Sequence, residues 1–172
     1  MSESEILFET ERLFARRLSQ ADAAEMAGIF GDIETMRYVG DSKPITEADC
    51  LYWVVDVTAK NFEKRGYGLI GFFDKSAGVM VACGGVFHPG QQPEPEVMYY
   101  LHRDWWGNGY ATELVKGLAP HAKINWGITW MMATIHPDNL PSQRVMIKCG
   151  FTHTKDRTNE DGSVTQIWEM SQ

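Results

Sequence analysis

The sequence predicts an α+β (mixed α/β) fold in which helices surround one sheet. Three observations support this. Helical patterns come first, over residues 19–66. Three strand patterns with short turns follow over residues 68–101, which is typical of an antiparallel meander. Strand and helix patterns then alternate to the end. With 172 residues the chain has the size of one ordinary domain, so we expect a single domain over residues 1–172.

The first elements are short. A basic, partly alternating stretch within residues 7–18 predicts one strand. Ser19 then has the character of a helix N-cap, with Asp22 three residues later, and residues 23–30 have helical spacing. A short second helix is expected over residues 33–38.

A third helix is expected to begin after Thr46, because Asp49 three residues later completes a capping-box pattern. It should end at Gly66. Its apolar face is predicted to carry Leu51, Val55, Thr58 and Phe62. The later elements are three strands (68–73, 79–87, 96–101), a helix after Gly109, a strand (129–135), a helix from Asn139 and two final strands (151–155, 164–170).

Composition excludes several classes of protein. The apolar fraction of 44% and the charged fraction of 23% are those of a globular chain. Sixteen Lys and Arg against 23 Asp and Glu give a net charge of −7, which disfavours general nucleic-acid binding. An acidic surface instead attracts cationic partners such as amines or basic peptides.

The sequence also bears on compartment and metal binding. The acidic start, Met-Ser-Glu-Ser-Glu, and the lack of an apolar run of about 20 residues predict a cytoplasmic protein without membrane association. The three cysteines form no Cys-x-x-Cys pair, so we expect free thiols. The five histidines lack metal-ligand spacing, so no metal is expected.

The most informative segment is residues 96–114. An aromatic strand leads into a loop with Gly107 and Gly109, and a helix opens at Tyr110. Glycines let backbone approach a ligand, and a helix start presents free N–H groups, a combination that binds phosphate. The alternative is an Asn108-Gly109 hairpin turn, although the residues that follow are good helix formers. The segment does not match a P-loop, because Gly-Lys-Ser/Thr is absent. It does not match the dinucleotide-binding motif either, because Thr112 stands where a third small residue is needed.

The run Tyr99-Tyr-Leu-His-Arg-Asp-Trp-Trp-Gly-Asn-Gly-Tyr-Ala-Thr-Glu113 resembles the acetyl-CoA pyrophosphate loop of the GCN5-related N-acetyltransferase (GNAT) superfamily. It is most similar to the branch that acetylates ribosomal-protein N-termini (RimJ/RimL type). Residues 10–16 resemble the opening strand of that branch. Residues 136–151 resemble its Asn-x-x-Ser followed by Lys-x-Gly-Phe. The resemblance covers most of the chain.

The resemblance implies a largely antiparallel, twisted sheet flanked by helices, with the fourth and fifth predicted strands splayed apart to admit the pantetheine arm of acetyl-CoA. Backbone groups at Tyr99 and Leu101 would pair with pantetheine amides. Asn139 would contact the cofactor arm, or serve only as a helix N-cap, and Ser142 would lie near the sulfur. Backbone N–H groups would hold the pyrophosphate at Trp106, Gly107, Asn108, Gly109, Tyr110, Ala111 and Thr112.

Three positions depart from the superfamily pattern. Asp104 stands where Gln or Arg is common, and Asn108 stands at an often basic position. The phosphates would then depend more on backbone donors and on a Lys or Arg elsewhere. Met146 replaces the Tyr that protonates the leaving thiolate in many members.

Three side chains are candidates for catalysis. Glu96, at the start of the fourth strand, is the expected base by analogy, with a solvated strand-end charge as the alternative. His88 has a suitable intrinsic pKa, although a loop histidine can be structural. Ser142 is the candidate acid, directly or through water, or only a helix-start hydrogen bond. Direct attack in a ternary complex is favoured over a Cys acyl-enzyme, because no Cys lies beside a readable base.

These observations predict an acetyl-CoA-dependent N-acetyltransferase that acts on a primary amine, either a protein N-terminus or a small amine. The alternative is a CoA-binding regulatory or interaction protein with the same fold and little turnover. Residues 26–66 would form most of the acceptor side, with Trp53 as a possible wall. The chain is expected to be a monomer, or a homodimer paired through a C-terminal edge strand.

Overall fold

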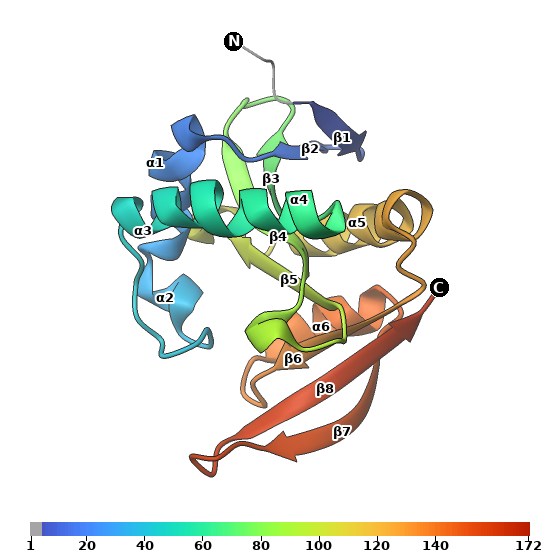
Figure 1. The fold of residues 1–172 in the computed structure, drawn as a ribbon. Coiled ribbons are helices and arrows are strands. Elements are labelled where there is room, and N and C mark those ends of the chain that lie inside the picture. Colours follow the sequence, from blue (N-terminus) through green and yellow to red (C-terminus); the bar gives the residue numbers. More distant parts are fainter. Residues whose placement is uncertain (1–4) are drawn as a thin grey trace.

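One eight-stranded sheet organises the molecule, in the order β1-β2-β3-β4-β5-β6-β8-β7 (Figure 1). The computed structural model describes residues 5–172. Neighbouring strands are antiparallel except for the parallel pair β5–β6. The mixed fold expected from the sequence is thereby confirmed. The strands are β1 (Ile6–Glu9), β2 (Leu13–Arg17), β3 (Leu69–Asp74), β4 (Met80–Phe87), β5 (Glu96–Leu101), β6 (Trp130–Ile135), β7 (Thr152–Thr158) and β8 (Val164–Ser171).

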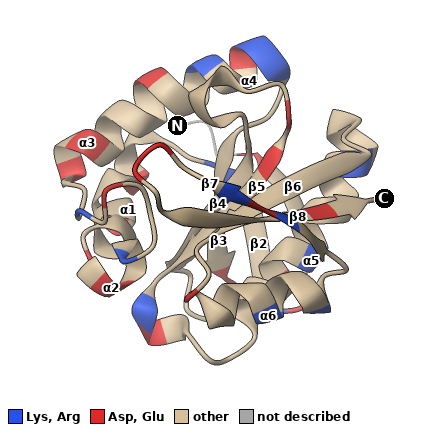
Figure 2. Ribbon diagram, turned by 90° about the horizontal axis from the view of Figure 1, so that it is seen from below, with Lys and Arg blue, Asp and Glu red and all other residues tan. Residues whose placement is uncertain are grey.

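Helices cover both faces of the sheet, and the view along its edge separates them (Figure 2). One side carries α1 (Ala23–Phe30), α2 (Ile33–Met36), α3 (Glu47–Tyr52) and α4 (Ala59–Arg65). The other side carries α5 (Tyr110–Trp126) and α6 (Leu140–Lys148). Each side has its own apolar core: Ile29 packs in the cluster with Phe73, and Leu114 in the cluster with Phe72. Strand alternation supplies both cores from one sheet.

Local signals in the sequence set most element boundaries. Thr46 caps α3 by accepting from the Asp49 N–H at 3.2 Å, and the Asp49 carboxylate accepts from the Thr46 N–H at 3.0 Å. Gly66 ends α4 with a left-handed φ of 79°. The structure gives β5 the bounds predicted from the sequence.

The structure corrects the prediction for the N-terminal strand. The sequence predicted one strand within residues 7–18, but the structure has a hairpin, β1 and β2. The chain turns at Thr10, whose N–H donates to the Leu13 carbonyl at 2.8 Å. The Leu13 N–H donates to the Thr10 hydroxyl at 3.1 Å. A side-chain turn of this kind leaves the apolar alternation on both sides unchanged, so the pattern alone did not reveal it.

The structure also corrects the predicted apolar face of the third helical segment. Leu51 and Val55 were predicted on its apolar face, but each is 40% exposed. Thr58, also predicted on that face, is buried as expected, and the other buried positions are Cys50 and Val54. A π-helical turn over Trp53–Thr58 joins α3 to α4. In this wider turn residues three apart, such as Val55 and Thr58, no longer share a face, so the face predicted at α-helical spacing is right at Thr58 and wrong at Leu51 and Val55.

Strands β5 and β6 separate shortly after they meet, and this splay positions the site. Their register contains one pair, Glu96 with Met132. The Met132 N–H also donates to the Pro95 carbonyl at 2.9 Å, at the same end. By contrast, β4 and β5 stay paired from Glu96 to Leu101. The splay of the fourth and fifth predicted strands is therefore present.

In the part of the chain that the structure describes, no helix combines the length and apolar character needed to cross a bilayer. The first four residues, whose acidity contributed to the expected cytoplasmic location, lie outside the described residues.

Candidate active site

The loop between β5 and α5 forms the centre of the site. Gly107 and Gly109 have φ of 75° and 83°, a left-handed conformation that favours glycine. Gly109 directly precedes α5, whose first N–H groups have no partners within the helix. A Cβ at Gly107 would meet no atom within 4 Å, so the loop backbone is open to a ligand. The helix that follows excludes the hairpin alternative.

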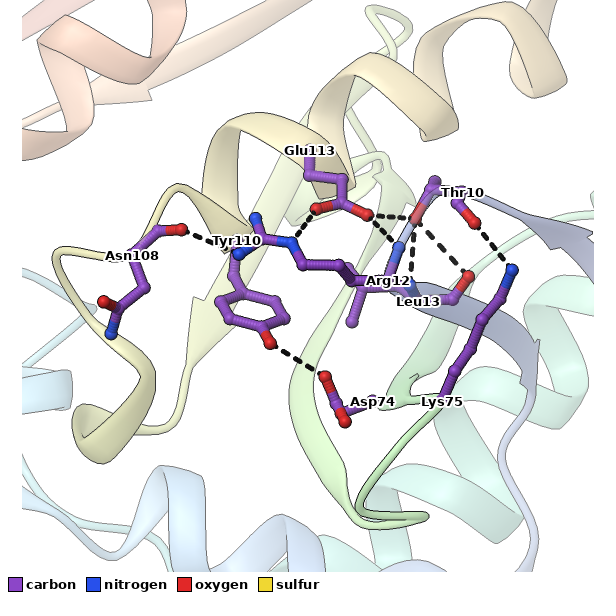
Figure 3. A network of polar contacts seen from close by, with 8 residues as sticks. All are labelled: Thr10, Arg12, Leu13, Asp74, Lys75, Asn108, Tyr110 and Glu113. Atoms are coloured by element: carbon purple, nitrogen blue, oxygen red, sulfur yellow. Dashed lines mark hydrogen bonds and ion pairs between the residues drawn. The ribbon is translucent and has the colours of Figure 1, made fainter.

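A polar network fixes this loop against the N-terminal hairpin (Figure 3). The Glu113 carboxylate, in the first turn of α5, accepts from the Thr10 hydroxyl at 2.6 Å and from the Arg12 N–H at 2.7 Å. It also accepts from Arg12 Nε at 2.6 Å. Arg12 Nη1 donates to the Asn108 carbonyl at 3.0 Å, and its guanidinium lies 3.9 Å from the Tyr110 ring centre. The Arg12 side chain therefore links the loop to the helix.

The Tyr110 side chain anchors the start of α5 to the end of β3. Its hydroxyl donates to the buried Asp74 carboxylate at 2.8 Å. That carboxylate also accepts from the Ser76 hydroxyl at 2.6 Å and from the Ala77 N–H at 2.8 Å. Hydrogen bonds from Ser76, Ala77 and Tyr110 lower the pKa of Asp74 to about 2. Tyr110, expected to contribute only a backbone N–H, thus also holds the loop through its side chain.

A polar cavity of about 470 Å³ adjoins the loop, and four charged side chains line it together with Gly109 and Thr112. Two are lysines that sequence reasoning did not assign, Lys116 and Lys148, and two are carboxylates, Glu11 and Glu113, of which Glu113 is paired with Arg12. Both lysines lower the pKa of Cys149, although burial dominates and raises it to about 11. Lys116 lies two helical turns after Gly109, a spacing that could have indicated it. The open glycines, the helix start and the two ammonium groups fit the phosphates of an anionic cofactor.

Alternation along β5 sends its side chains to opposite faces of the sheet. Tyr100 points to the α1 side, where its ring centre lies 4.9 Å from that of Phe30. Tyr99 points to the α6 side, where its hydroxyl lies 2.7 Å from the Ser142 hydroxyl. Glu96 shares the face of Tyr100. The splay therefore has the candidate base on one side and the candidate acid on the other.

The start of α6 brings together Asn139, Ser142 and Tyr99. Asn139 caps the helix, since its side-chain oxygen accepts from the Ser142 N–H at 3.3 Å. Its contact with a cofactor stays a prediction. Burial raises the pKa of Tyr99 to about 12, so its hydroxyl keeps its proton at neutral pH. Met146, in the position of the missing Tyr, is 1% exposed in the core. The Tyr99 side chain was missed because the sequence does not indicate which helix its strand faces.

Glu96 is buried, with 4% of its surface exposed, so the solvated strand-end alternative is wrong. One carboxylate oxygen accepts from both the hydroxyl and the N–H of Thr134 on β6, the latter at 3.2 Å. The other accepts from the Gln92 amide at 3.3 Å. Glu96 thus links β5 to β6 at the point where they separate. Its role as a base stays a prediction.

His88 lies near this group, with both ring nitrogens in hydrogen bonds. Nδ1 lies 3.0 Å from the Gln92 carbonyl, which can only accept, so Nδ1 carries the proton. Nε2 lies 2.7 Å from the Tyr67 hydroxyl. These contacts fix residues 88–92, including the Gln92 that contacts Glu96. Its catalytic role also stays a prediction.

Two backbone positions assigned by resemblance differ in their surroundings. The Trp106 indole folds back and donates to the Leu101 carbonyl at 2.8 Å. That carbonyl therefore already has one partner. Tyr99 pairs with Gly84 of β4 through its backbone. The contacts of both residues with pantetheine stay predictions.

A second cavity, of about 350 Å³, opens on the α1 side of β5. Its wall is formed mainly by apolar side chains from residues 26–53, together with Met98 and Tyr100 of β5. Trp53, considered from the sequence as a wall of an acceptor pocket, is part of it.

The model of the acetyltransferase (GNAT) domain family matches residues 12–152. The chain therefore belongs to the GNAT family and is an acetyltransferase that uses acetyl-CoA. It is 26% identical over 147 residues to the "Uncharacterized N-acetyltransferase YoaA" of Bacillus subtilis (strain 168), a match that covers 84% of this chain and 82% of that one.

Solved structures share the fold. An acetyltransferase from Agrobacterium tumefaciens str. C58 has a TM-score of 0.81 at 22% identity, over 96% of this chain and 94% of that one. RimL, named a ribosomal L7/L12 alpha-N-protein acetyltransferase and solved with coenzyme A, has a TM-score of 0.81 at 14% identity, over 97% and 98%. At these identities the likeness concerns the fold alone.

Proposed function

We propose that this acetyltransferase transfers the acetyl group of acetyl-CoA to a primary amine, by direct attack of the amine on the thioester. The observation that carries the proposal is the unit formed by β5, the Gly107–Gly109 loop and the start of α5, next to the splay of β5 and β6. Backbone donors at a helix start explain how a chain of net charge −7 holds an anionic cofactor.

The binding residues follow from this unit. Backbone N–H groups from Trp106 to Thr112 would hold the pyrophosphate, as the resemblance implies. Lys116 and Lys148 extend the same surface and are our candidates for the remaining phosphate, since both line the polar cavity beside Gly109. Backbone groups of β5 would pair with the pantetheine arm inside the splay, and Asn139 would lie beside it.

Acetyl-CoA supplies an activated acyl group, and the protein must handle two protons. The amine arrives protonated at neutral pH, and we assign its deprotonation to Glu96, held in place by Thr134 and Gln92. The C–N bond forms as the C–S bond breaks, and the nitrogen loses its second proton to water. Ser142 would give its proton to the leaving sulfur and regain one from Tyr99, whose hydroxyl is 2.7 Å away, and Tyr99 would then take up a proton from water.

Direct attack is favoured over an acetylated cysteine because the thiols are poor nucleophiles here. Burial raises the pKa of Cys50 and Cys149 to about 11, so both remain protonated at neutral pH. Cys83 is fully buried, and burial raises its pKa as well.

The test is release of CoA from acetyl-CoA against a panel of acceptors that includes small primary amines and peptides with free N-termini. We expect release that depends on the amine and is absent with the N-acetylated form of the same acceptor. CoA release at the same rate with and without the amine would contradict the proposal. Binding of acetyl-CoA without release for any acceptor would favour the regulatory alternative, which family membership does not favour.

The single domain over residues 1–172 and the choice between monomer and homodimer stay predictions. Strand β7 forms one edge of the sheet, and all of its residues are exposed. Its charged residues, such as Lys155 and Arg157, are typical of an edge that resists pairing.

A further inference from the structure

We propose that the acceptor bears a bulky apolar group next to its primary amine, and that this group occupies the cavity of about 350 Å³ on the α1 side of β5. The inference rests on the proposed function, because it names the class of amine that the enzyme acetylates. It distinguishes apolar amines from polyamines and aminoglycosides, which carry several cationic groups.

The lining of the cavity is the first observation. Side chains from α1, α2, the π-helical turn and β5 form its wall, and they are almost all apolar; among them are Met26, Phe30, Met36, Trp53, Met98 and Tyr100. The volume lies within the range of pockets that enclose a small ligand. Methionine and aromatic side chains together fit a ring or a branched chain of varied shape.

The charges at the cavity are the second observation. Its lining contains two charged residues, Asp41 and Lys43, whose side chains pair with each other at 2.8 Å. Both side chains are more than half exposed, so this pair lies at the rim in water. No carboxylate within the lining is therefore available for the further cationic groups of a polyamine, and burying an unpaired ammonium in apolar surroundings is strongly unfavourable.

The position of the cavity is the third observation. Met98 and Tyr100 line it, and Glu96 lies two residues before Met98 on the same face of β5. Glu96 lies outside the lining itself, and its charge contributes, after the larger effect of burial, to the raised pKa of Tyr100. An apolar group in the cavity would thus direct its amine along β5 toward Glu96 and the splay.

This arrangement refines the meaning of the net charge of −7. The acidic surface attracts any cationic acceptor, but the cavity admits only one whose charge is confined to the amine that reacts. Each methylene group buried there should improve the specificity constant roughly fourfold.

The experiment compares acceptors in pairs at saturating acetyl-CoA. Phenylalaninamide is compared with glycinamide, and phenethylamine with spermidine; a peptide that begins with Phe is compared with one that begins with Gly. We expect kcat/KM to favour the apolar member of each active pair by about tenfold or more. Activity on phenethylamine and phenylalaninamide would identify a small free amine as the acceptor. Activity on the peptide alone would identify a protein N-terminus as the acceptor.

A matched pair of variants assigns the preference to the cavity. Trp53→Ala removes a lining side chain, whereas Tyr52→Ala removes its exposed neighbour outside the lining. We expect Trp53→Ala to reduce the preference for phenylalaninamide over glycinamide about tenfold, with an unchanged KM for acetyl-CoA and Tyr52→Ala as wild type. The thermal midpoint with acetyl-CoA checks that each variant folds.

The outcomes separate this inference from the proposed function. Preference for spermidine, or an equal effect of both variants on phenylalaninamide, would overturn the inference while the acetyltransferase assignment to amines stands. Release of CoA that no amine stimulates would overturn the proposed function and the inference with it. A rise in thermal midpoint with phenethylamine but not with spermidine would support the cavity independently of turnover.

Discussion

Replacing Gly109 by Val tests how the loop holds its ligand. Gly109 has a φ of 83°, and a Cβ there would meet only Arg12 Nη2, at an ordinary contact distance of 3.6 Å. The substitution is therefore disfavoured by backbone conformation rather than by a clash within the protein. A β-branched residue in this region is a conformational outlier.

The expected magnitude follows from that conformation. A non-glycine residue held in the left-handed region costs about 1–3 kcal/mol. The chain escapes this cost if φ returns to a negative value, which turns the N–H groups at the start of α5 away from the phosphates. The same energy then appears as weaker binding, about 5- to 140-fold in the KM for acetyl-CoA. The turnover number at saturating acetyl-CoA should change much less.

Gly127 provides a matched control at the other end of the same helix. It ends α5 with a φ of 68°, and a Cβ there would meet no atom within 4 Å. Gly127→Val should therefore cost similar stability and leave the KM for acetyl-CoA unchanged. Steady-state kinetics and urea unfolding of both variants are the measurements. An equal rise in KM for both, or none for Gly109→Val, would refute the reasoning.

Four further substitutions, one of them a control, test individual contacts. Glu96→Gln should lower kcat and alter its pH profile, whereas Thr134→Val, which removes the hydroxyl donor but keeps the carboxylate, should lower kcat much less; equal losses of kcat for both would leave Glu96 as a structural link. Tyr110→Phe should cost about 2 kcal/mol at neutral pH. The folded pKa of Asp74, about 2, lies below its ordinary value of 3.8, so this stabilisation is present above pH 3.8 and is lost as pH falls toward 2. Urea unfolding should therefore show a difference in free energy of unfolding between wild type and Tyr110→Phe that shrinks in acid; a constant difference would contradict this. Tyr99→Phe should lower kcat with little change in KM for either substrate, and unchanged kcat would remove Tyr99 from the proton path.

Features set by adjacent residues could be predicted from the sequence. The Thr46–Asp49 cap and the bounds of β5 depend on residue types a few positions apart. The phosphate loop was predictable for the same reason, since Gly107, Gly109 and the helix formers that follow are contiguous. In such elements the local residue choices agree with the global fold.

Contacts between distant segments could not be predicted in this way. Glu113 contacts Arg12 across 101 residues, and Tyr99 contacts Ser142 across 43. Nothing in either local sequence indicates the partner, because the sheet order and the face of each strand decide it. The burial of Glu96 depends likewise on Thr134, a residue of another strand. The apolar character of the cavity on the α1 side of β5 likewise arises from side chains that are far apart in the sequence, from Met26 to Tyr100.

Binding of acetyl-CoA to the loop and splay is the central claim, and thermal unfolding tests it most directly. Acetyl-CoA at about 100 times its dissociation constant should stabilise the protein by about 2.7 kcal/mol, seen as a raised midpoint. ATP, which carries phosphates but lacks the pantetheine arm, should produce a much smaller shift at the same concentration. An absent shift with acetyl-CoA, or an equal one with ATP, would contradict the account.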